Sequence, residues 1–311
     1  MNSPKITFNP RWRYRYAAGG LLLCLLLVSW GGVVTSIEAG LAVPDWPSSF
    51  GSYDPIATGY NDPANPDARW WQEGPVLAEH GHRLLGVLVG LWVVGLALWT
   101  WLADSRRWVR ILAVSATGLV ILQGVLGGLR VIWTSMDLAV VHAMGAQLFF
   151  CAAVILTVSN SHTWLTHNIE RSPGIRQLRI LAGSTAVAVY IQILLGALLR
   201  HPGAGVDLTF IIVHAAGSVL VLSLIIVTCG RIREHFSNKP LLNRGAWVML
   251  TCLILQLILG MFALTTLLYD AGQGQRSLAQ VVLSSSHLVV GTILMGSCAC
   301  VLLGTLRLRS G

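Results

Sequence analysis

The chain has 311 residues, 54% of them hydrophobic and only 11% charged, and its mean hydropathy is +0.68. Because soluble globular proteins carry roughly 25% charged residues, this composition excludes a water-soluble globular protein and indicates lipid as the natural solvent. The net charge of +8 would suit nucleic acid, but the basic residues gather at the ends of apolar blocks, so we expect no nucleic-acid partner.

Eight apolar blocks follow one another along the chain, each close to the ~20 residues that a helix needs to cross a bilayer. They cover residues 17–38, 80–103, 110–133, 138–159, 178–200, 209–230, 246–268 and 280–306. Inside lipid every backbone N–H and C=O group needs a partner within its own segment, so the blocks should be helices. The sequence therefore predicts an all-α integral membrane protein with eight transmembrane helices.

The connecting segments predict the orientation of the chain in the membrane. With eight helices, both termini and the loops 104–109, 160–177 and 231–245 share one side. That side holds sixteen of the 21 Lys and Arg residues, namely Lys5, Arg11, Arg13, Arg15, Arg106, Arg107, Arg110, Arg171, Arg176, Arg179, Arg231, Arg233, Lys239, Arg244, Arg307 and Arg309. The positive-inside rule then predicts that both termini are cytoplasmic, and we expect the first span to act as a signal anchor.

The eight helices divide into two halves that repeat. The motif Gln-x-x-x-Gly occurs three times, as Gln123 to Gly127, Gln192 to Gly196 and Gln256 to Gly260. Because each half has an even number of helices, both enter the membrane from the same side, which predicts two four-helix bundles as parallel repeats. The predicted regions are a cytoplasmic arm 1–16, an N-terminal half 17–159 with a long outer loop 39–78, a cytoplasmic linker 160–177, a C-terminal half 178–306 and a cytoplasmic tail 307–311.

Four of the nine histidines lie a few residues inside the outer ends of the even-numbered helices, namely His82, His142, His214 and His287. A histidine is costly to bury unpaired within a span, so it marks a functional site by default. An interhelical hydrogen bond would explain one such residue, a proton relay would not explain the repeat, and zinc needs three or four convergent ligands. Two opposed imidazoles on neighbouring helices suit the axial positions of haem iron, which predicts one haem site per half.

The first half has two features that the second lacks. Glu79, His82 and Arg83 have the spacing of one helix face, where the carboxylate could shuttle protons or place a substrate. The alternative is an acid in the first helical turn, paired with Arg83. The outer loop 39–78 is long and contains several prolines and tryptophans, whereas the corresponding loop 201–208 is short. Such a loop is either functional or a cap.

Three arginines, Arg83, Arg130 and Arg200, lie near outer helix ends, where the propionates of a bound haem would emerge. Guanidinium groups suit carboxylates, and snorkelling to the membrane interface is the alternative. His80 and His201 receive no assignment from the sequence.

Several of these residues together resemble the haem A synthase family. They are, in chain order, Trp30-Gly-Gly-Val-Val-Thr35 leading into Ala39-Gly-Leu41, Pro44-Asp-Trp-Pro47, Glu79-x-x-His82-Arg83, His142, His214 and His287. The resemblance covers nearly the whole chain. It implies an oxidoreductase that uses oxygen to convert the C8 methyl group of haem O, through a hydroxymethyl stage, to the formyl group of haem A, the last step of haem A biosynthesis for cytochrome oxidase.

The resemblance also implies roles for single residues. His82 and His142 would be the axial ligands of the substrate haem O, with Arg83 at the same haem and Glu79 as the catalytic residue. The permanent cofactor, haem b, would have the axial ligands His214 and His287 and would pass electrons. The implied location is the bacterial plasma (inner) membrane. The implied partners are the lipid bilayer, haem O synthase, cytochrome oxidase assembly factors and an electron donor such as a quinol, and a homo-oligomer stays open.

One departure concerns the first outer loop. Many members of the family have Cys-Pro-Asp-Trp-Pro-x-Cys there, whereas this chain has Val43 and Ser49 at the two cysteine positions. All six cysteines of the chain lie in predicted helices, where we expect them to act as small apolar side chains. Other contacts must hold the loop, and Trp46 and the prolines are the candidates.

Two other functions are compatible with the sequence. One is a di-haem b-type membrane electron carrier, linked to quinol, that alters no haem. The sequence speaks against cytochrome b of the quinol complexes, because each helix here has one candidate ligand and all four lie on the outer side. The other is a haem carrier or assembly factor without chemistry.

Overall fold

The computed structural model describes residues 10–54, 69–166, 170–200, 208–273 and 276–309. Its helices are α1 (Pro10–Ser36), α2 (Gly74–Ala103), α3 (Arg107–Ile132), α4 (Met136–Ser159), α5 (His162–Thr166), α6 (Ile175–Leu199), α7 (Leu208–His235), α8 (Pro240–Gln273) and α9 (Leu278–Leu306). All of them except the short α5 are long and apolar enough to cross a membrane. The predicted all-α fold with eight membrane-spanning helices is therefore confirmed.

The helices extend beyond the apolar blocks, and one extension changes an interpretation. The second span begins at Gly74, with a proline in its first turn, and not near residue 80. Proline is favoured there because the first N–H groups of a helix have no partner within the helix. The outer loop is consequently 37–73, and Glu79 lies in the second turn. The suggestion that Glu79 is a first-turn acid is wrong.

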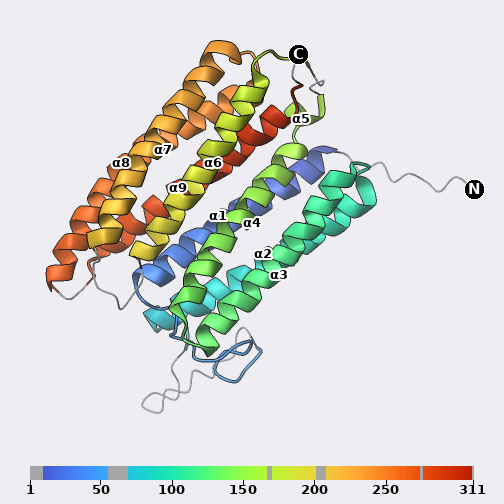
Figure 1. Ribbon diagram of the computed structural model, residues 1–311. Helices are drawn as coiled ribbons and strands as arrows, with labels where there is room; N and C mark the ends of the chain where they lie inside the picture. Colours follow the sequence, from blue (N-terminus) through green and yellow to red (C-terminus); the bar gives the residue numbers. More distant parts are fainter. Residues whose placement is uncertain (1–9, 55–68, 167–169, 201–207, 274–275, 310–311) are drawn as a thin grey trace, which may run out of the picture.

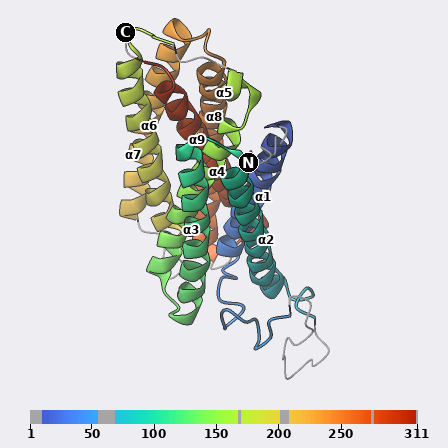
Figure 2. The same ribbon diagram turned by 90° about the vertical axis from the view of Figure 1, so that its right-hand side faces the viewer.

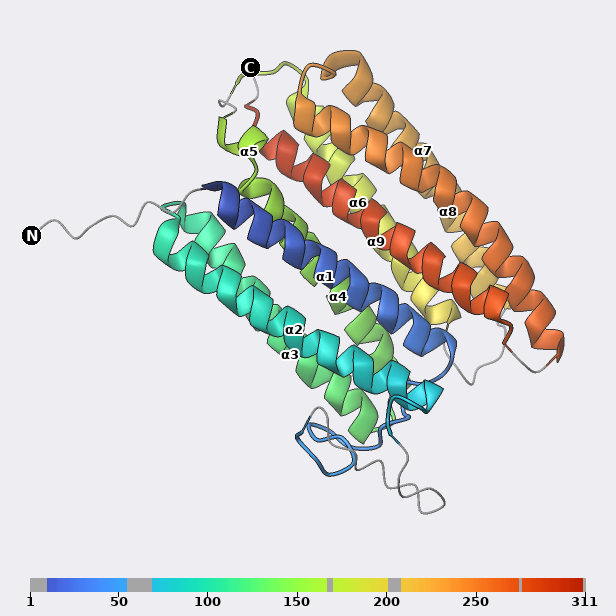
Figure 3. The ribbon, with the colours of Figure 1, turned by 180° about the vertical axis from the view of Figure 1, so that it is seen from behind.

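The long helices form two groups of four, α1–α4 and α6–α9 (Figure 1). Within each group every helix contacts the next, and the last also packs against the first. The two groups meet along α1 and α4 on one side and α9 and α6 on the other, so that α1, α4 and α9 lie in the middle when the molecule is seen from behind (Figure 3). Helix α9 contacts both groups. This explains why 67% of the residues in its most apolar 18-residue stretch are buried inside the protein, compared with 11% in the corresponding stretch of α7.

The two ends of the molecule differ. The start of α1, the short α5 and the last described residues lie at one end, where the backbone of Arg309 bonds to Glu170 and Ser172. The outer loop lies at the other end, beyond the α1–α4 bundle (Figure 2). Helices α2, α4, α7 and α9 all begin at this outer-loop end, so residues in their first turns share one level of the structure.

Candidate functional site

Four histidines lie within about three turns of the starts of α2, α4, α7 and α9. Each contacts a glycine of the preceding long helix, in the pairs Gly31 with His82, Gly127 with His142, Gly196 with His214 and Gly260 with His287. A Cβ atom at these glycines would lie only 2.9 to 3.3 Å from the ring carbon Cε1. Each imidazole thus lies in a slot that a larger residue would fill.

The Nδ1 side of each ring faces the helix that provides the slot. Nδ1 of His142 lies 3.1 Å from the carbonyl oxygen of Gln123. Since a carbonyl can only accept a hydrogen bond, this contact requires the proton on Nδ1 and leaves the lone pair on Nε2. Such second contacts orient the histidines that bind metals. The slot therefore fixes both the ring and its free nitrogen.

The other three rings have a related environment. The side-chain amide of Gln192 donates to the carbonyl oxygen of His214 at 2.7 Å and lies 3.3 Å from Nδ1 of the same residue. His82 lies near the backbone of Leu27 of α1, and His287 lies near the backbone of Gln256 of α8. The Nδ1 atoms of these two histidines have no hydrogen bond of full quality. The repeat of glutamines and glycines is visible in the sequence, but only the structure shows that these residues contact the histidines.

The spacing of the second pair fits one iron atom. The ring centres of His214 and His287 are 6.3 Å apart. Two imidazoles that bind one metal through nitrogens about 2 Å away hold their ring centres roughly 6 Å apart. His142 is close enough to His82 to act on its charge. Each pair offers two histidines as axial ligands, and a glycine behind each ring leaves space for it. This arrangement fits the predicted haem groups.

Glu79 and Arg83 lie beside the first pair and hold the outer loop. Glu79 is 4% exposed, and its Oε1 accepts a hydrogen bond from Arg83 at 2.7 Å. Its Oε2 accepts one from the backbone N–H of Val43 at 2.9 Å. Arg83 also donates to the carbonyl oxygens of Val43 and Asp45, at 2.9 and 2.7 Å. This ion pair between α2 residues therefore fixes the start of the loop on the helix.

The outer loop has further contacts in place of a cysteine pair. The Asp45 carboxylate accepts hydrogen bonds from the Ser48 hydroxyl and from the backbone N–H groups of Phe50 and Gly51. Burial raises the pKa of this carboxyl, but these hydrogen bonds outweigh the effect and the pKa lies below its usual value. The ring of Trp46 lies against Gly128 of α3, where a Cβ atom would collide with it. The described cysteines are all free.

One further histidine lies near this loop. His80 is buried, its ring centre is 4.6 Å from that of Trp70, and its Nδ1 is 3.1 Å from the Ser49 hydroxyl. These contacts make His80 part of the packing between α2 and the loop. His201 lies outside the described residues.

The arginines of the second half join the two halves. Arg200 donates to the carbonyl oxygen of Gly32 at 3.0 Å and also bonds the hydroxyl of Ser36. Arg276 donates to the carbonyl oxygen of Ser36 at 3.0 Å and pairs with Glu38 at 2.6 Å. Both therefore hold the end of α1. Sequence reasoning gave Arg276 no role, because its partners are distant in the chain.

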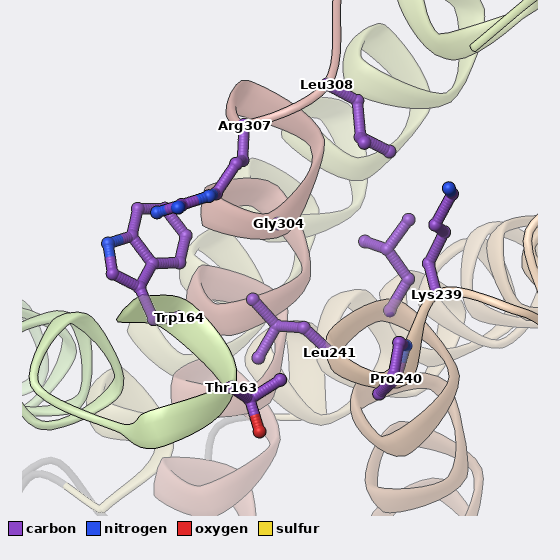
Figure 4. A pocket seen from close by; sticks show the side chains of 9 residues that line it. Thr163, Trp164, Lys239, Pro240, Leu241, Gly304, Arg307 and Leu308 are labelled. Atoms are coloured by element: carbon purple, nitrogen blue, oxygen red, sulfur yellow. The ribbon is translucent and has the colours of Figure 1, made fainter. Parts of the chain in front are cut away.

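A pocket of about 40 Å³ lies at the opposite end of the molecule, between α5, the start of α8 and the end of α9 (Figure 4). Its lining includes Trp164, Lys239 and Arg307, whose guanidinium lies over the Trp164 ring at 4.5 Å. Gly304 of this pocket is 17 residues beyond His287 on α9, which is roughly 25 Å along a helix. The pocket is therefore separate from the histidine pairs.

Relatives named "Heme A synthase" resemble this chain. One from Exiguobacterium sp. is 28% identical over 188 residues, 60% of this chain and 56% of the relative. One from Geobacillus kaustophilus is 27% identical, with coverages of 61% and 56%. One from Lysinibacillus sphaericus is 25% identical over 285 residues, with coverages of 82% and 85%. The chain thus spans about half the length of the first two relatives.

A family profile also matches the chain. The profile of the family COX15-CtaA, described as "Cytochrome oxidase assembly protein", matches residues 14–213. This region includes the first bundle except the first residues of α1, and it continues through α6 into α7. The match exceeds half of the chain and agrees with the multi-pass helical fold. The chain belongs to the COX15-CtaA family of cytochrome oxidase assembly proteins.

Proposed function

We propose that this protein is a haem A synthase, which oxidises the C8 methyl group of haem O to the formyl group of haem A through a hydroxymethyl intermediate. The observation that carries the proposal is the presence of two histidine pairs in similar settings, of which, among the described residues, only the first has a buried carboxylate beside it. The relatives named "Heme A synthase" support the same reading. A site that alters haem and a site that keeps haem are what this reaction needs.

The first half is the proposed substrate site. His82 and His142 hold haem O, and Glu79 is the catalytic residue. Each oxygen of its carboxylate accepts one hydrogen bond and retains a lone pair, so the group can accept a proton near the reacting carbon. Arg83 serves this site by holding Glu79 in place.

The second half is the proposed cofactor site, with haem b between His214 and His287. Haem b supplies single-electron transfer when bound. Written as two monooxygenations, each step consumes dioxygen, two electrons and two protons, places a hydroxyl on the methyl carbon and releases water. Loss of a further water from the resulting diol leaves the formyl group. The contacts of α1 and α4 with α9 keep the two sites in fixed relation.

The proposed setting is the bacterial plasma membrane. The two bundles are parallel repeats, and both termini face the cytoplasm because the basic residues gather at that end. The partners are haem O synthase as the source of substrate, cytochrome oxidase assembly factors as acceptors of product, and a membrane reductant such as a quinol. A homo-oligomer is compatible with this arrangement.

The decisive experiment is co-expression with a haem O synthase in a host that makes no haem A, followed by extraction and mass analysis of the haems. We expect haem A, with some hydroxymethyl intermediate, in the presence of oxygen. Purified protein that retains haem b but yields only unchanged haem O would contradict the proposal and favour the di-haem electron carrier. A variant without His82 and His142 is the control for background oxidation.

A further inference from the structure

Arg130, at the end of α3, differs from the neighbouring arginines because nothing in the described part of the chain pairs with it. Among the described residues it has no hydrogen-bond or ion-pair partner, and its Nε atom is buried without one. Its guanidinium lies against Gly40, where a Cβ atom would be 2.1 Å from a terminal nitrogen. A half-buried cation without an anion is costly in a membrane protein, which indicates that the site is built to receive a negative group.

The surroundings of Arg130 place that negative group at the first histidine pair. Arg130 lies three residues after Gly127 on α3, the glycine that faces the His142 ring. The charge of Arg130 acts on His82 and His142, and that of Glu79 acts on Arg130. Glu79 already accepts hydrogen bonds from Arg83 and Val43, and it forms no contact with Arg130 of hydrogen-bond length. The cation thus lies beside the proposed substrate haem and beside the catalytic carboxylate, without being used by either.

The other two arginines that the sequence placed near haem propionates are occupied. The terminal nitrogens of Arg83 make four hydrogen bonds, to Glu79 and to three carbonyl oxygens of the outer loop. Arg200 is bonded to Gly32 and Ser36 of α1. Arg130 is therefore the arginine near the substrate pair whose donors are available to a ligand.

We propose that Arg130 binds a propionate carboxylate of the substrate haem and thereby determines which methyl group is oxidised. This inference rests on the proposed function. The C8 methyl group shares its pyrrole ring with one propionate. When Arg130 holds that propionate, the C8 methyl group lies on the same side of the macrocycle as Arg130, which is near enough to Glu79 for the two charges to interact. Rotation of the macrocycle about its two axial ligands, which the histidines alone would permit, is prevented.

The test compares haem O with its dimethyl ester, which lacks the carboxylates. Both are titrated into the purified protein that contains haem b, and binding is followed by absorption of the added haem. Charge-assisted hydrogen bonds of this kind suggest that Arg130→Gln weakens binding of free haem O by about 10- to 100-fold. Binding of the ester should not change. Arg130→Lys, which keeps the charge without the fork, should recover part of the difference.

Two further variants sharpen the result. Arg69→Gln removes a cation that lies over Trp71 in the outer loop, and it should leave the preference for free haem O unchanged. Gly40→Val displaces the guanidinium without removing its charge, and it should reduce the preference. Products of Arg130→Gln should include haems oxidised at other methyl groups, which fragmentation mass analysis distinguishes.

The outcomes separate this inference from the proposed function. If Arg130→Gln retains haem b, binds the ester normally and still prefers free haem O as the unaltered protein does, Arg130 has no such role even where haem A is made. If the unaltered protein shows the preference and loses it in Arg130→Gln but makes no haem A, the binding role stands and the synthase function fails. If the unaltered protein binds neither haem, both fail.

Discussion

The two bundles hold their histidines alike but use their charged residues differently. In both, each ring lies against a glycine of the preceding long helix. In the first bundle Glu79 and Arg83 fix the outer loop beside the pair, and Arg130 has no partner among the described residues. In the second bundle Arg200 and Arg276 hold the end of α1. The two halves thus give their histidines a similar setting, while nearby charged residues fix the outer loop in one half and contact the end of α1 in the other.

The comparison also explains the value of the glycine slots. A histidine within a membrane helix has several staggered side-chain positions, and a ligand must keep only one. The slot restricts the ring by shape, and the neighbouring carbonyl or amide restricts it by hydrogen bonding. Shape and hydrogen bonding within the protein thus orient these rings, as the proposed axial ligands would require.

The largest expected effect comes from removing a histidine. We expect His287→Ala to abolish haem b in the purified protein, because the proposed haem b site has only His214 and His287 as axial side chains. His82→Ala should retain haem b and lose binding of haem O. Pyridine haemochrome spectra measure the first, and titration with haem O measures the second. The opposite distribution would show that the assignment of the halves is reversed.

The next largest effect concerns Glu79, which is the proposed catalytic residue and also holds the outer loop. We expect Glu79→Ala to retain haem b but to stop or stall oxidation of haem O. Glu79→Gln can still accept a hydrogen bond from Val43 or Arg83, so it should protect the outer loop from amide hydrogen exchange better than alanine does. If glutamine restores both protection and oxidation, Glu79 acts only as a support for the loop.

A smaller effect tests the glycine slots. We expect Gly196→Val to overpack the His214 slot, at a cost of about 1–3 kcal/mol in stability, and to lower the haem b content. Gly183→Val on the same helix is the matched control, because a Cβ atom there meets nothing within 4 Å. Thermal unfolding in detergent and haem content measure both variants. If the two variants had the same stability and the same haem content, the glycine slot would not be needed to hold His214.

The smallest effect is a pH dependence confined to the outer loop. Hydrogen bonding holds the pKa of Asp45 below its usual value despite burial, so its contribution is complete above the pKa of the unfolded chain, about 3.9. The contribution is lost as the pH falls through the lower pKa of the folded state. Amide exchange at Phe50 and Gly51, corrected for the intrinsic rates, should rise there and approach that of Asp45→Asn. Unchanged protection at low pH would show that the carboxylate charge is not needed.

Much of the site was predictable because its signals are local. Lengths of apolar blocks predict spans, and a histidine inside a span stands out against apolar neighbours. The same reasoning placed Glu79 and Arg83 on one face of a helix. It missed the start of α2 at Gly74, because the first turns of that helix contain Glu79, His80 and other residues that hydropathy assigns to a loop. It also missed the Leu27 position of α1, where the Gln-x-x-x-Gly motif lacks its glutamine but Gly31 still forms a slot.

The sequence by itself determined the all-helical membrane fold and the four histidines, because the bilayer leaves the backbone few choices and makes each buried imidazole costly. Only the tertiary structure decided how the arginines are used. Arg83, Arg130 and Arg200 look alike along the chain, and each has the same charge near a helix end. Arg83 and Arg200 donate to carbonyl groups of the outer loop and of α1, many residues away, whereas Arg130 has no partner among the described residues. Packing of these segments leaves one guanidinium for a ligand and engages the other two.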